Sequence, residues 1–126
     1  MSTTRDLIGG LPRNYLRACV LLLLAEAPSH GYELLEGLRD LGIDRADPGG
    51  LYRSLRAMEQ EGLVSSLWEE STAGPARRSY TLTDAGEQSL GNWATILKDV
   101  RKVLDAYLVR QSMVAPGGPQ QAARHL

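Results

Sequence analysis

Hydrophobic and polar positions alternate along the chain with periods that predict four helices and one β-hairpin. The helices are expected at about residues 14–26, 31–41, 47–61 and 84–113, and the hairpin strands at 63–68 and 77–82. Three helices, a two-stranded ribbon and then a fresh helix is the order typical of a winged helix-turn-helix. We therefore expect a mainly α fold, with three helices, a hairpin wing and a long C-terminal helix.

Each of the first three helices carries an apolar stripe that predicts its buried face. The stripes are Leu16, Val20, Leu23 and Ala27 on the first helix, Tyr32, Leu35 and Leu38 on the second, and Leu51, Leu55 and Met58 on the third. The third helix also has an opposite stripe, formed by Tyr52, Arg53, Arg56 and Gln60. One face should anchor this helix, which leaves the other free to reach a partner.

Local signals mark where the helices should begin and end. Asp47, followed by a proline, predicts the start of the third helix, and Gly62 predicts its end because glycine tolerates the left-handed conformation there. Ser29 is expected to cap the second helix. Asp84 and Glu87 stand three residues apart, so we expect Asp84 to be the N-cap of the fourth helix and Glu87 its return partner.

The return strand of the hairpin opens with Arg77 and Arg78, directly after a turn that contains glycine and proline. Both arginines are therefore expected at the tip of the ribbon. Glu69 and Glu70 on the opposing strand should partly cancel their charge.

The fourth helix carries a heptad seam, in which apolar residues are separated alternately by three and four positions. The seam consists of Leu90, Trp93, Leu97, Val100, Leu104 and Tyr107, and the apolar face is widened by Ile96, Val103 and Leu108. Packing across the chain's own winged domain is one interpretation. The favoured interpretation is an isologous dimer of two such helices, because the face is wider than one small core can cover.

Composition limits the size of the core, the charge of the surface and the cellular location that we expect. A chain of 126 residues with 43% hydrophobic content suits one compact domain with a modest core. The net charge of −1 argues against a strongly basic nucleic-acid binder, so any basic surface must be local. The single cysteine, Cys19, is expected to be a small buried hydrophobe in a reducing cytoplasm. The apolar run at 18–25 is too short for a bilayer span and follows no signal-peptide pattern, so we expect neither a membrane segment nor export.

Several short blocks, in matching order and spacing, resemble the PadR family of bacterial transcriptional regulators over about Tyr15 to Trp93. The blocks are Ser29-His30-Gly31-Tyr32-Glu33-Leu34, Gly50-Leu51-Tyr52-Arg53-Ser54-Leu55, Glu61-Gly62-Leu63-Val64, Gly74-Pro75-Ala76-Arg77-Arg78 and Tyr80-Thr81-Leu82-Thr83, followed by Gly86. The resemblance implies a homodimeric, cytoplasmic winged-helix repressor of a kind that usually responds to a small molecule. The single, fairly short C-terminal helix is similar to that of the smaller subgroup.

The resemblance also implies a division of the chain and a partner. We expect a flexible arm over residues 1–12, a DNA-binding winged helix-turn-helix over 13–83, a dimerisation helix over 84–113 and a disordered tail over 114–126. The expected partner is double-stranded DNA, with two half-sites about one turn apart for the two subunits.

Residue roles follow from the same resemblance. Tyr52, Arg53 and Arg56 match the recognition-helix face that enters the major groove, with Ser54 beside them. An arginine fork there can bind the O6 and N7 atoms of a guanine.

Two features of the third helix leave alternatives open. Arg53 and Arg56 could form an ordinary solvated surface, paired with Glu59 or Glu61. Gly50 stands where the family often has threonine. Loss of the threonine hydroxyl could loosen the start of the helix. Alternatively, the pair Gly49-Gly50 could allow a DNA phosphate to approach the backbone, because helix N-termini offer free N–H groups to anions.

Further roles are implied for the wing and the seam. Arg77 and Arg78 match a basic wing tip that meets phosphates or the minor groove. Trp93 matches a tryptophan that some multidrug-binding relatives use to stack planar aromatic ligands, although a seam tryptophan is more often simply buried. A nucleotide or another metabolite at the dimer interface would fit equally well.

The chain shows no machinery for catalysis. It has no nucleophile elbow, P-loop, dinucleotide-binding glycine pattern or zinc-protease motif, so no enzymatic activity, cofactor or metal is expected. His30 lacks companions at ligand spacing and is expected to order the start of the second helix. Besides a DNA-binding regulator, a winged helix used as a protein-interaction module remains open, with the acidic overall balance as its only support.

Overall fold

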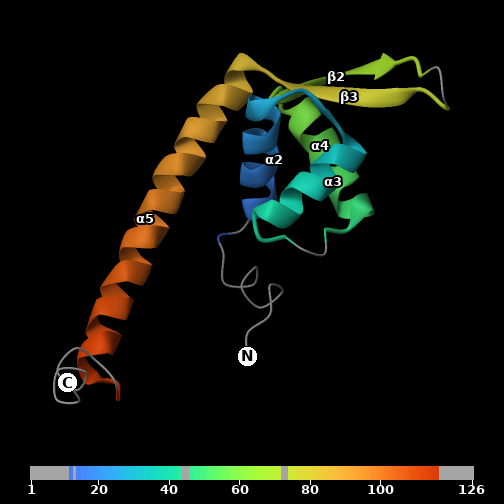
Figure 1. Cartoon of the computed structure of the whole chain (residues 1–126). Helices are drawn as coiled ribbons and strands as arrows, with labels where there is room; N and C mark the ends of the chain where they lie inside the picture. The colour runs from blue at the N-terminus through green and yellow to red at the C-terminus, as the bar shows by residue number, and fades with distance from the viewer. Residues whose placement is uncertain (1–11, 13, 44–45, 72–73, 117–126) are drawn as a thin grey trace. The chain divides into compact units, whose positions relative to one another are not determined.

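The computed structural model describes residues 12, 14–43, 46–71 and 74–116. Its elements are α2 (Tyr15–Glu26), β1 (Ser29–His30), α3 (Gly31–Asp40), α4 (Pro48–Gln60), β2 (Val64–Glu69), β3 (Arg77–Leu82) and α5 (Asp84–Val114) (Figure 1). The predicted mainly α, winged-helix class is confirmed. Apart from Pro12 and residues 114–116, the expected arm and tail lie outside the described residues.

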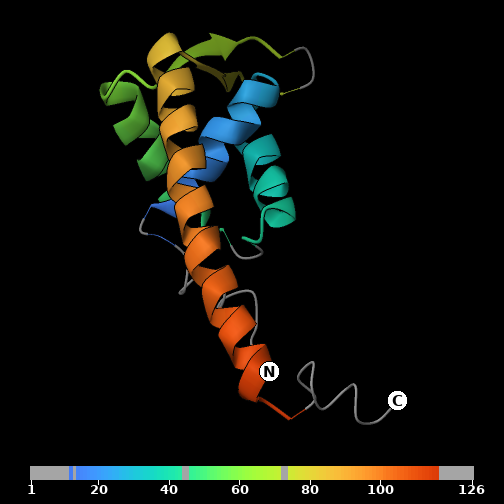
Figure 2. The same ribbon diagram turned by 90° about the vertical axis from the view of Figure 1, so that its left-hand side faces the viewer.

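The chain divides into two compact units, residues 1–91 and 92–126. The first contains α2, α3, α4 and the sheet, and α5 begins in it and continues into the second. Within the first unit the three helices lie together, and the hairpin of β2 and β3 projects beyond them (Figures 1 and 2).

The core of the first unit is built from the apolar faces of its three helices and the base of the hairpin. Its fully buried side chains are Val20 and Leu21 of α2, Leu34 and Leu38 of α3, Leu51, Leu55 and Met58 of α4, and Val64 of β2. The stripe predicted for α4 is therefore confirmed in full. Cys19 is buried as predicted.

The faces predicted for the first two helices are partly wrong. On α2, Leu23 is only half-buried and Ala27 is exposed, while Leu21 and Leu24 are buried. The run at 18–25 is apolar on all sides, so its periodicity could not select a face. On α3, Tyr32 is 70% exposed because Leu34 and Leu38, one turn apart, are the residues that point into the core.

The ends of α4 are as predicted. The side chain of Asp47 accepts hydrogen bonds from the backbone N–H groups of Gly49 at 3.3 Å and Gly50 at 3.0 Å. Gly62 follows the helix with a φ of 81°, in the left-handed region that glycine tolerates. At α3 the expected cap was wrong, because Ser29 donates to the carbonyl of Ala27 instead and His30 is the N-cap.

The start of α5 differs from the prediction by one residue. The cap is Thr83 rather than Asp84, because the Thr83 hydroxyl accepts from the backbone N–H of Gly86 at 3.0 Å. The same hydroxyl donates to the carbonyl of Gly62 at 2.6 Å. A Cβ at Gly86 would overlap the carbonyl oxygen of Leu63, so the first turn of α5 lies directly against the turn after α4.

The sheet has three antiparallel strands in the order β1-β3-β2, one strand more than the predicted hairpin. Strand β1 contains only two residues, which is too short for any period to be read from the sequence. In the hairpin, Ser66 lies opposite Tyr80, Trp68 opposite Arg78 and Glu69 opposite Arg77. This register fixes which wing side chains share a face.

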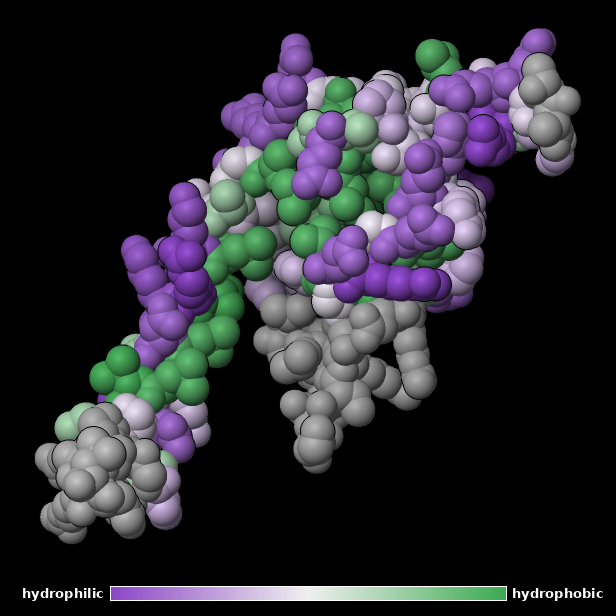
Figure 3. Space-filling model, in the orientation of Figure 1, coloured by the Kyte–Doolittle hydropathy of each residue, from purple (hydrophilic) through white to green (hydrophobic). Residues whose placement is uncertain are grey.

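Helix α5 is 31 residues long and exposes a broad apolar face in the single chain, visible in Figure 3. Its exposed large hydrophobic residues are Ile96, Val103, Leu104, Tyr107, Leu108, Val109, Met113 and Val114. Among the described helices, α5 included, none combines the length and apolarity that crossing a bilayer requires.

Candidate nucleic-acid interface

Helix α4 presents the predicted polar stripe on its solvent side. Tyr52 is 47% exposed, Arg53 and Arg56 are exposed, and Ser54 is half-buried. The buried stripe of α4 fixes the helix on the core, so these side chains project from a rigid element rather than from a loop.

The two arginines of this face have different surroundings. The guanidinium of Arg53 lies 3.6 Å from a carboxylate oxygen of Asp47, and both side chains are largely exposed. Such a pair contributes little and exchanges readily for another anion. Arg56 forms no ion pair with any acidic side chain among the described residues. The structure therefore leaves its guanidinium accessible.

The glutamates that could have neutralised these arginines are engaged elsewhere. Glu61 pairs with Arg17 of α2 through hydrogen bonds of 2.9 and 2.5 Å, which lower the pKa of the Glu61 carboxyl. Glu59 accepts from the Ser66 hydroxyl at 2.7 Å. The interpretation of Arg53 and Arg56 as partners of these glutamates is not what the structure shows.

Tyr52 has a packing role although the residue is partly exposed. A Cβ built on Gly31, at the start of α3, would lie 2.5 Å from the Tyr52 hydroxyl and 2.8 Å from two ring carbons. The Tyr52 ring thus occupies the space beside Gly31 that a Cβ would need, so a larger residue there would have to displace the ring. This contact fixes the angle between the two helices of the helix-turn-helix and explains why glycine follows His30.

Gly50 is not required by the space around it. A Cβ there would meet the Asp47 carboxylate at 3.5 Å and the Arg53 guanidinium at 3.7 Å, which are ordinary contacts. The N–H of Gly50 is already bonded to Asp47, so the start of α4 is capped rather than loose. A phosphate approaching this N–H would also meet the negative charge of Asp47.

The wing arginines do not behave alike. Arg77 is exposed and lies opposite Glu69. Arg78 is half-buried, and its Nε donates to the hydroxyl of Ser66 at 2.8 Å. Its guanidinium also lies 5.2 Å from the centre of the Trp68 ring. Arg78 is therefore held against the body of the hairpin, which the sequence did not indicate.

His30 joins the wing to the start of α3, a role that the sequence indicated only in part. Its Nδ1 lies 2.7 Å from a Glu33 carboxylate oxygen and its Nε2 lies 3.0 Å from one of Glu69. Both hydrogen bonds raise the pKa of the imidazole, the one to Glu33 more than the one to Glu69. With a carboxylate at each ring nitrogen, both nitrogens act as donors only when the ring is charged.

The predicted seam residues divide into two groups. Leu90, Trp93, Leu97 and Val100 are half-buried in the single chain, whereas Leu104 and Tyr107 are exposed by 55% and 68%. The exposed group lies in the second unit, on the part of α5 that carries most of the exposed apolar residues. Among the described residues, no cluster of histidine, cysteine or carboxylate side chains could hold a metal ion.

A helical core that carries an exposed arginine-bearing helix and a β-hairpin wing defines the winged-helix class. The chain belongs to the PadR-like family of transcriptional regulators, whose family model matches residues 20–92. The resemblance seen in the sequence is thereby confirmed.

Individual relatives agree with this family. The chain is 31% identical over 77 residues to the transcriptional regulator YqjI of Escherichia coli, which covers 60% of this chain and 35% of that protein. It matches the crystal structure of a PadR-like regulator of Bacillus cereus with a TM-score of 0.66 and 28% identity, over 74% of this chain and 90% of that one. The chain spans 21% to 35% of the length of the curated relatives it matches.

One solved relative contains nucleic acid. The Bacillus subtilis PadR structure, in complex with operator DNA, matches with a TM-score of 0.59 and 25% identity, over 66% of this chain and 48% of that one.

Proposed function

We propose that this chain is a DNA-binding transcriptional repressor of the cytoplasm, acting as a homodimer on an inverted-repeat site. The observation that carries the proposal is the two-sided α4. Leu51, Leu55 and Met58 are fully buried on one side, while Arg53 and Arg56 are exposed on the other. The relative bound to operator DNA supports it, since it shares the winged-helix fold.

Within this proposal, Arg56 is the principal reader of sequence. Its guanidinium has no acidic partner among the described residues and can offer a fork to the O6 and N7 atoms of guanine. Arg53 exchanges its exposed pair with Asp47 for a base or a phosphate. Tyr52 and Ser54 lie beside them, with Tyr52 placed by its contact with Gly31.

The wing positions the protein on the duplex. Arg77 is exposed at the start of β3 and is suited to a phosphate contact, which orients a protein without reading sequence. Arg78 is held by Ser66 and contributes its charge from within the hairpin.

The dimer is proposed to form through α5. The apolar face that includes Leu104 and Tyr107 is exposed in one chain, and burying such side chains stabilises an interface by about 1.5–3 kcal/mol each. A two-fold axis through this face would continue the seam of Leu90, Leu97 and Val100. It would also hold two α4 helices at a separation that matches half-sites about one turn apart.

A small-molecule effector is proposed at the same interface, with Trp93 stacking a planar aromatic compound or a nucleotide base. Trp93 is half-buried in the single chain. A ligand there changes DNA affinity only through its different affinities for the two arrangements of the subunits. Quenching of Trp93 fluorescence by planar cations, measured in the Trp68→Phe variant in which Trp93 is the only tryptophan, would support this. No quenching at saturating compound would remove the effector site.

The test of DNA binding is a titration of the full chain against labelled duplex DNA taken from upstream of its own gene, at several salt concentrations. We expect Arg56→Ala to lose about 1–3 kcal/mol of binding free energy and to relax specificity at one base pair. Arg53→Ala should weaken binding and reduce the slope of log affinity against log salt if it contacts phosphate.

Lys102→Ala is the matched control, since Lys102 is an exposed cation on the side of α5 opposite the seam. Its affinity should equal that of the wild type. Binding unaffected by both arginine substitutions would contradict the assignment of the reading face. Affinity that does not depend on salt would favour a protein-interaction module instead.

A further inference from the structure

The wing carries a large aromatic side chain in the open. Trp68 of β2 is 65% exposed, although tryptophan is among the residues that gain most from burial. Its indole is nevertheless held, because the guanidinium of Arg78 lies 5.2 Å from the ring centre. This distance is within the range of a cation–π interaction.

Arg78 is in turn fixed by side chains from two other elements. Its Nε donates to the Ser66 hydroxyl at 2.8 Å, and that hydroxyl donates to Glu59 of α4 at 2.7 Å. The guanidinium is also 3.8 Å from the second carboxylate oxygen of Glu59. The chain of contacts therefore runs from α4 through β2 and β3 to the indole. A side chain ordered in advance loses less entropy when it binds a partner.

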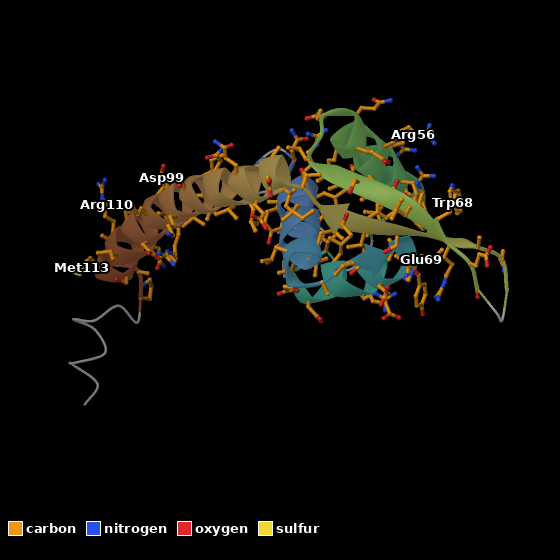
Figure 4. The ribbon with its side chains drawn as sticks, turned by 90° about the horizontal axis from the view of Figure 1, so that it is seen from above. Arg56, Trp68, Glu69, Asp99, Arg110 and Met113 are labelled. Atoms are coloured by element: carbon orange, nitrogen blue, oxygen red, sulfur yellow. The ribbon has the colours of Figure 1, made fainter. Side chains whose placement is uncertain are left out.

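The indole lies on the same side of the hairpin as the reading face of α4. Residues alternate across a strand, so Val64, Ser66 and Trp68 share one side. Val64 is buried in the core and Ser66 contacts Glu59 of α4, which identifies that side as the one turned toward α4. In Figure 4, Arg56 and Trp68 lie on this side, whereas Glu69 lies on the other.

Tyr80 is a buried aromatic residue at the base of the hairpin. It lies opposite Ser66 in the hairpin and is buried. Burial raises the pKa of the Tyr80 phenol, and the charges of Arg78, Glu59 and Arg56 also act on it. The arginine of the reading face and the arginine beside the indole therefore both favour the ionised form of the same buried phenol.

We propose that Trp68 is a DNA-contacting residue of the wing, with its indole packed against sugars and base edges in the groove beside the one entered by α4. Arg78 is then a positioning residue that orders the indole rather than a free phosphate contact. The proposal rests on the DNA-binding function proposed above. Apolar side chains are a recurrent way for proteins to engage the minor groove.

The first test compares two exposed apolar residues that are neighbours in β2. Trp68→Ala removes the proposed contact, while Leu67→Ala removes a side chain that is 75% exposed on the opposite side of the hairpin. The probe is a short labelled duplex selected by the wild-type chain from a random-sequence pool. We expect Trp68→Ala to bind about tenfold more weakly. Because no charge is lost, the dependence of its affinity on salt should stay unchanged, and Leu67→Ala should bind like the wild type.

The second test separates positioning from charge. Arg78→Lys keeps the positive charge but loses the planar group that stacks on the indole. We expect Arg78→Lys to weaken DNA binding nearly as much as Trp68→Ala does. The variant that carries both changes should bind no more weakly than either single variant, because both changes remove the same contact. A purely electrostatic role for Arg78 predicts wild-type affinity for the lysine variant.

Fluorescence gives a direct readout of the contact. The chain has two tryptophans, so Trp93→Phe leaves Trp68 as the only one. Addition of the selected duplex should then protect the indole from quenching by acrylamide. Protection should be lost at a salt concentration that dissociates the complex.

The outcomes distinguish this proposal from the one on which it rests. Equal affinities for wild type and Trp68→Ala, with an indole that stays open to acrylamide, would overturn the role of Trp68. DNA binding itself would stand if Arg56→Ala still weakened it. Equal losses for Trp68→Ala and Leu67→Ala would also overturn the role, since they would report a weakened wing. If the wild-type chain selects no duplex, both proposals fail.

Discussion

Substitution by alanine is expected to have opposite effects on stability at two glycines in the first turns of α5. At Gly86 an added Cβ would overlap the Leu63 carbonyl oxygen and lie 2.5 Å from Leu82 Cδ1. At Gly91, five residues later, nothing lies within 4 Å of such a Cβ. Alanine in a helix is favoured over glycine by about 0.8–1.0 kcal/mol. Gly91→Ala should therefore stabilise the fold by up to that amount.

At Gly86 the same gain is outweighed by overpacking. Forcing extra volume into a packed site costs about 1–3 kcal/mol, and a backbone oxygen cannot rotate away as a side chain can. Relief by moving α5 would strain the Thr83 cap, whose hydroxyl bonds both Gly86 and Gly62. We expect Gly86→Ala to lower the free energy of unfolding by about 2 kcal/mol, which leaves about 3 kcal/mol between the two variants.

The assay is urea unfolding followed by circular dichroism, at one fixed protein concentration because subunit association contributes to stability. Midpoints for Gly86→Ala, Gly91→Ala and the wild type are compared with a common slope. Equal midpoints for the two variants would refute the reasoning, because they would mean that the first turn of α5 does not lie against Leu63.

Three further predictions concern the wing, α4 and α5. The pKa of His30 in the folded protein is raised above 6.5. The stability that its charged ring contributes is therefore fully present below pH 6.5 and is lost as the pH rises through the folded-state pKa. The melting temperature should fall across this pH range in the wild type but not in His30→Gln. Parallel plots of melting temperature against pH for the two proteins would contradict a stabilising contact between charged His30 and Glu69. Asp47→Ala should lower the free energy of unfolding by about 1 kcal/mol while Asp47→Asn retains the cap, as measured by urea unfolding; equal stability of the alanine variant would exclude the capping role. Leu104→Asp should halve the mass measured by light scattering, whereas Lys102→Ala should not, and an unchanged mass would place the subunit contact elsewhere.

Strong local signals made α4 predictable. Leu51, Leu55 and Met58 repeat at helical spacing, and each is fully buried. Asp47 before a proline and Gly62 after the last turn each have a local backbone reason, so both ends could be placed without knowledge of the fold. The exposed stripe of α4 followed from the same periodicity.

Features that depend on the third dimension were not predictable. The run at 18–25 is apolar on all sides, and only packing against α3 and β3 selects its inner face. Strand β1 exists because it pairs with β3, since two residues have no pattern of their own. His30 meets Glu69 across 39 positions of sequence, and no local rule connects them.

In the candidate site, too, some features have a local sequence signal and others depend on tertiary contacts. The placement of Arg53 and Arg56 on the solvent side of α4 followed from the helical period, but the hydrogen bond that fixes Arg78 on Ser66 did not. Glu59, Ser66 and Arg78 belong to three different elements, and only the hairpin register together with the packing of α4 on β2 brings them together. Trp68 was seen as part of an apolar run, and its exposure becomes evident only from its place beyond the core.

In the proposed dimer, two copies of α4 read one duplex together. Hydroxyl-radical footprinting on a duplex selected by the full chain tests this most directly. We expect two protected segments related by a two-fold axis, with centres about 10 base pairs apart, and two chains per duplex. Insertion of half a turn between the segments should abolish tight binding. A single protected segment occupied by one chain would rule out paired reading by two α4 helices.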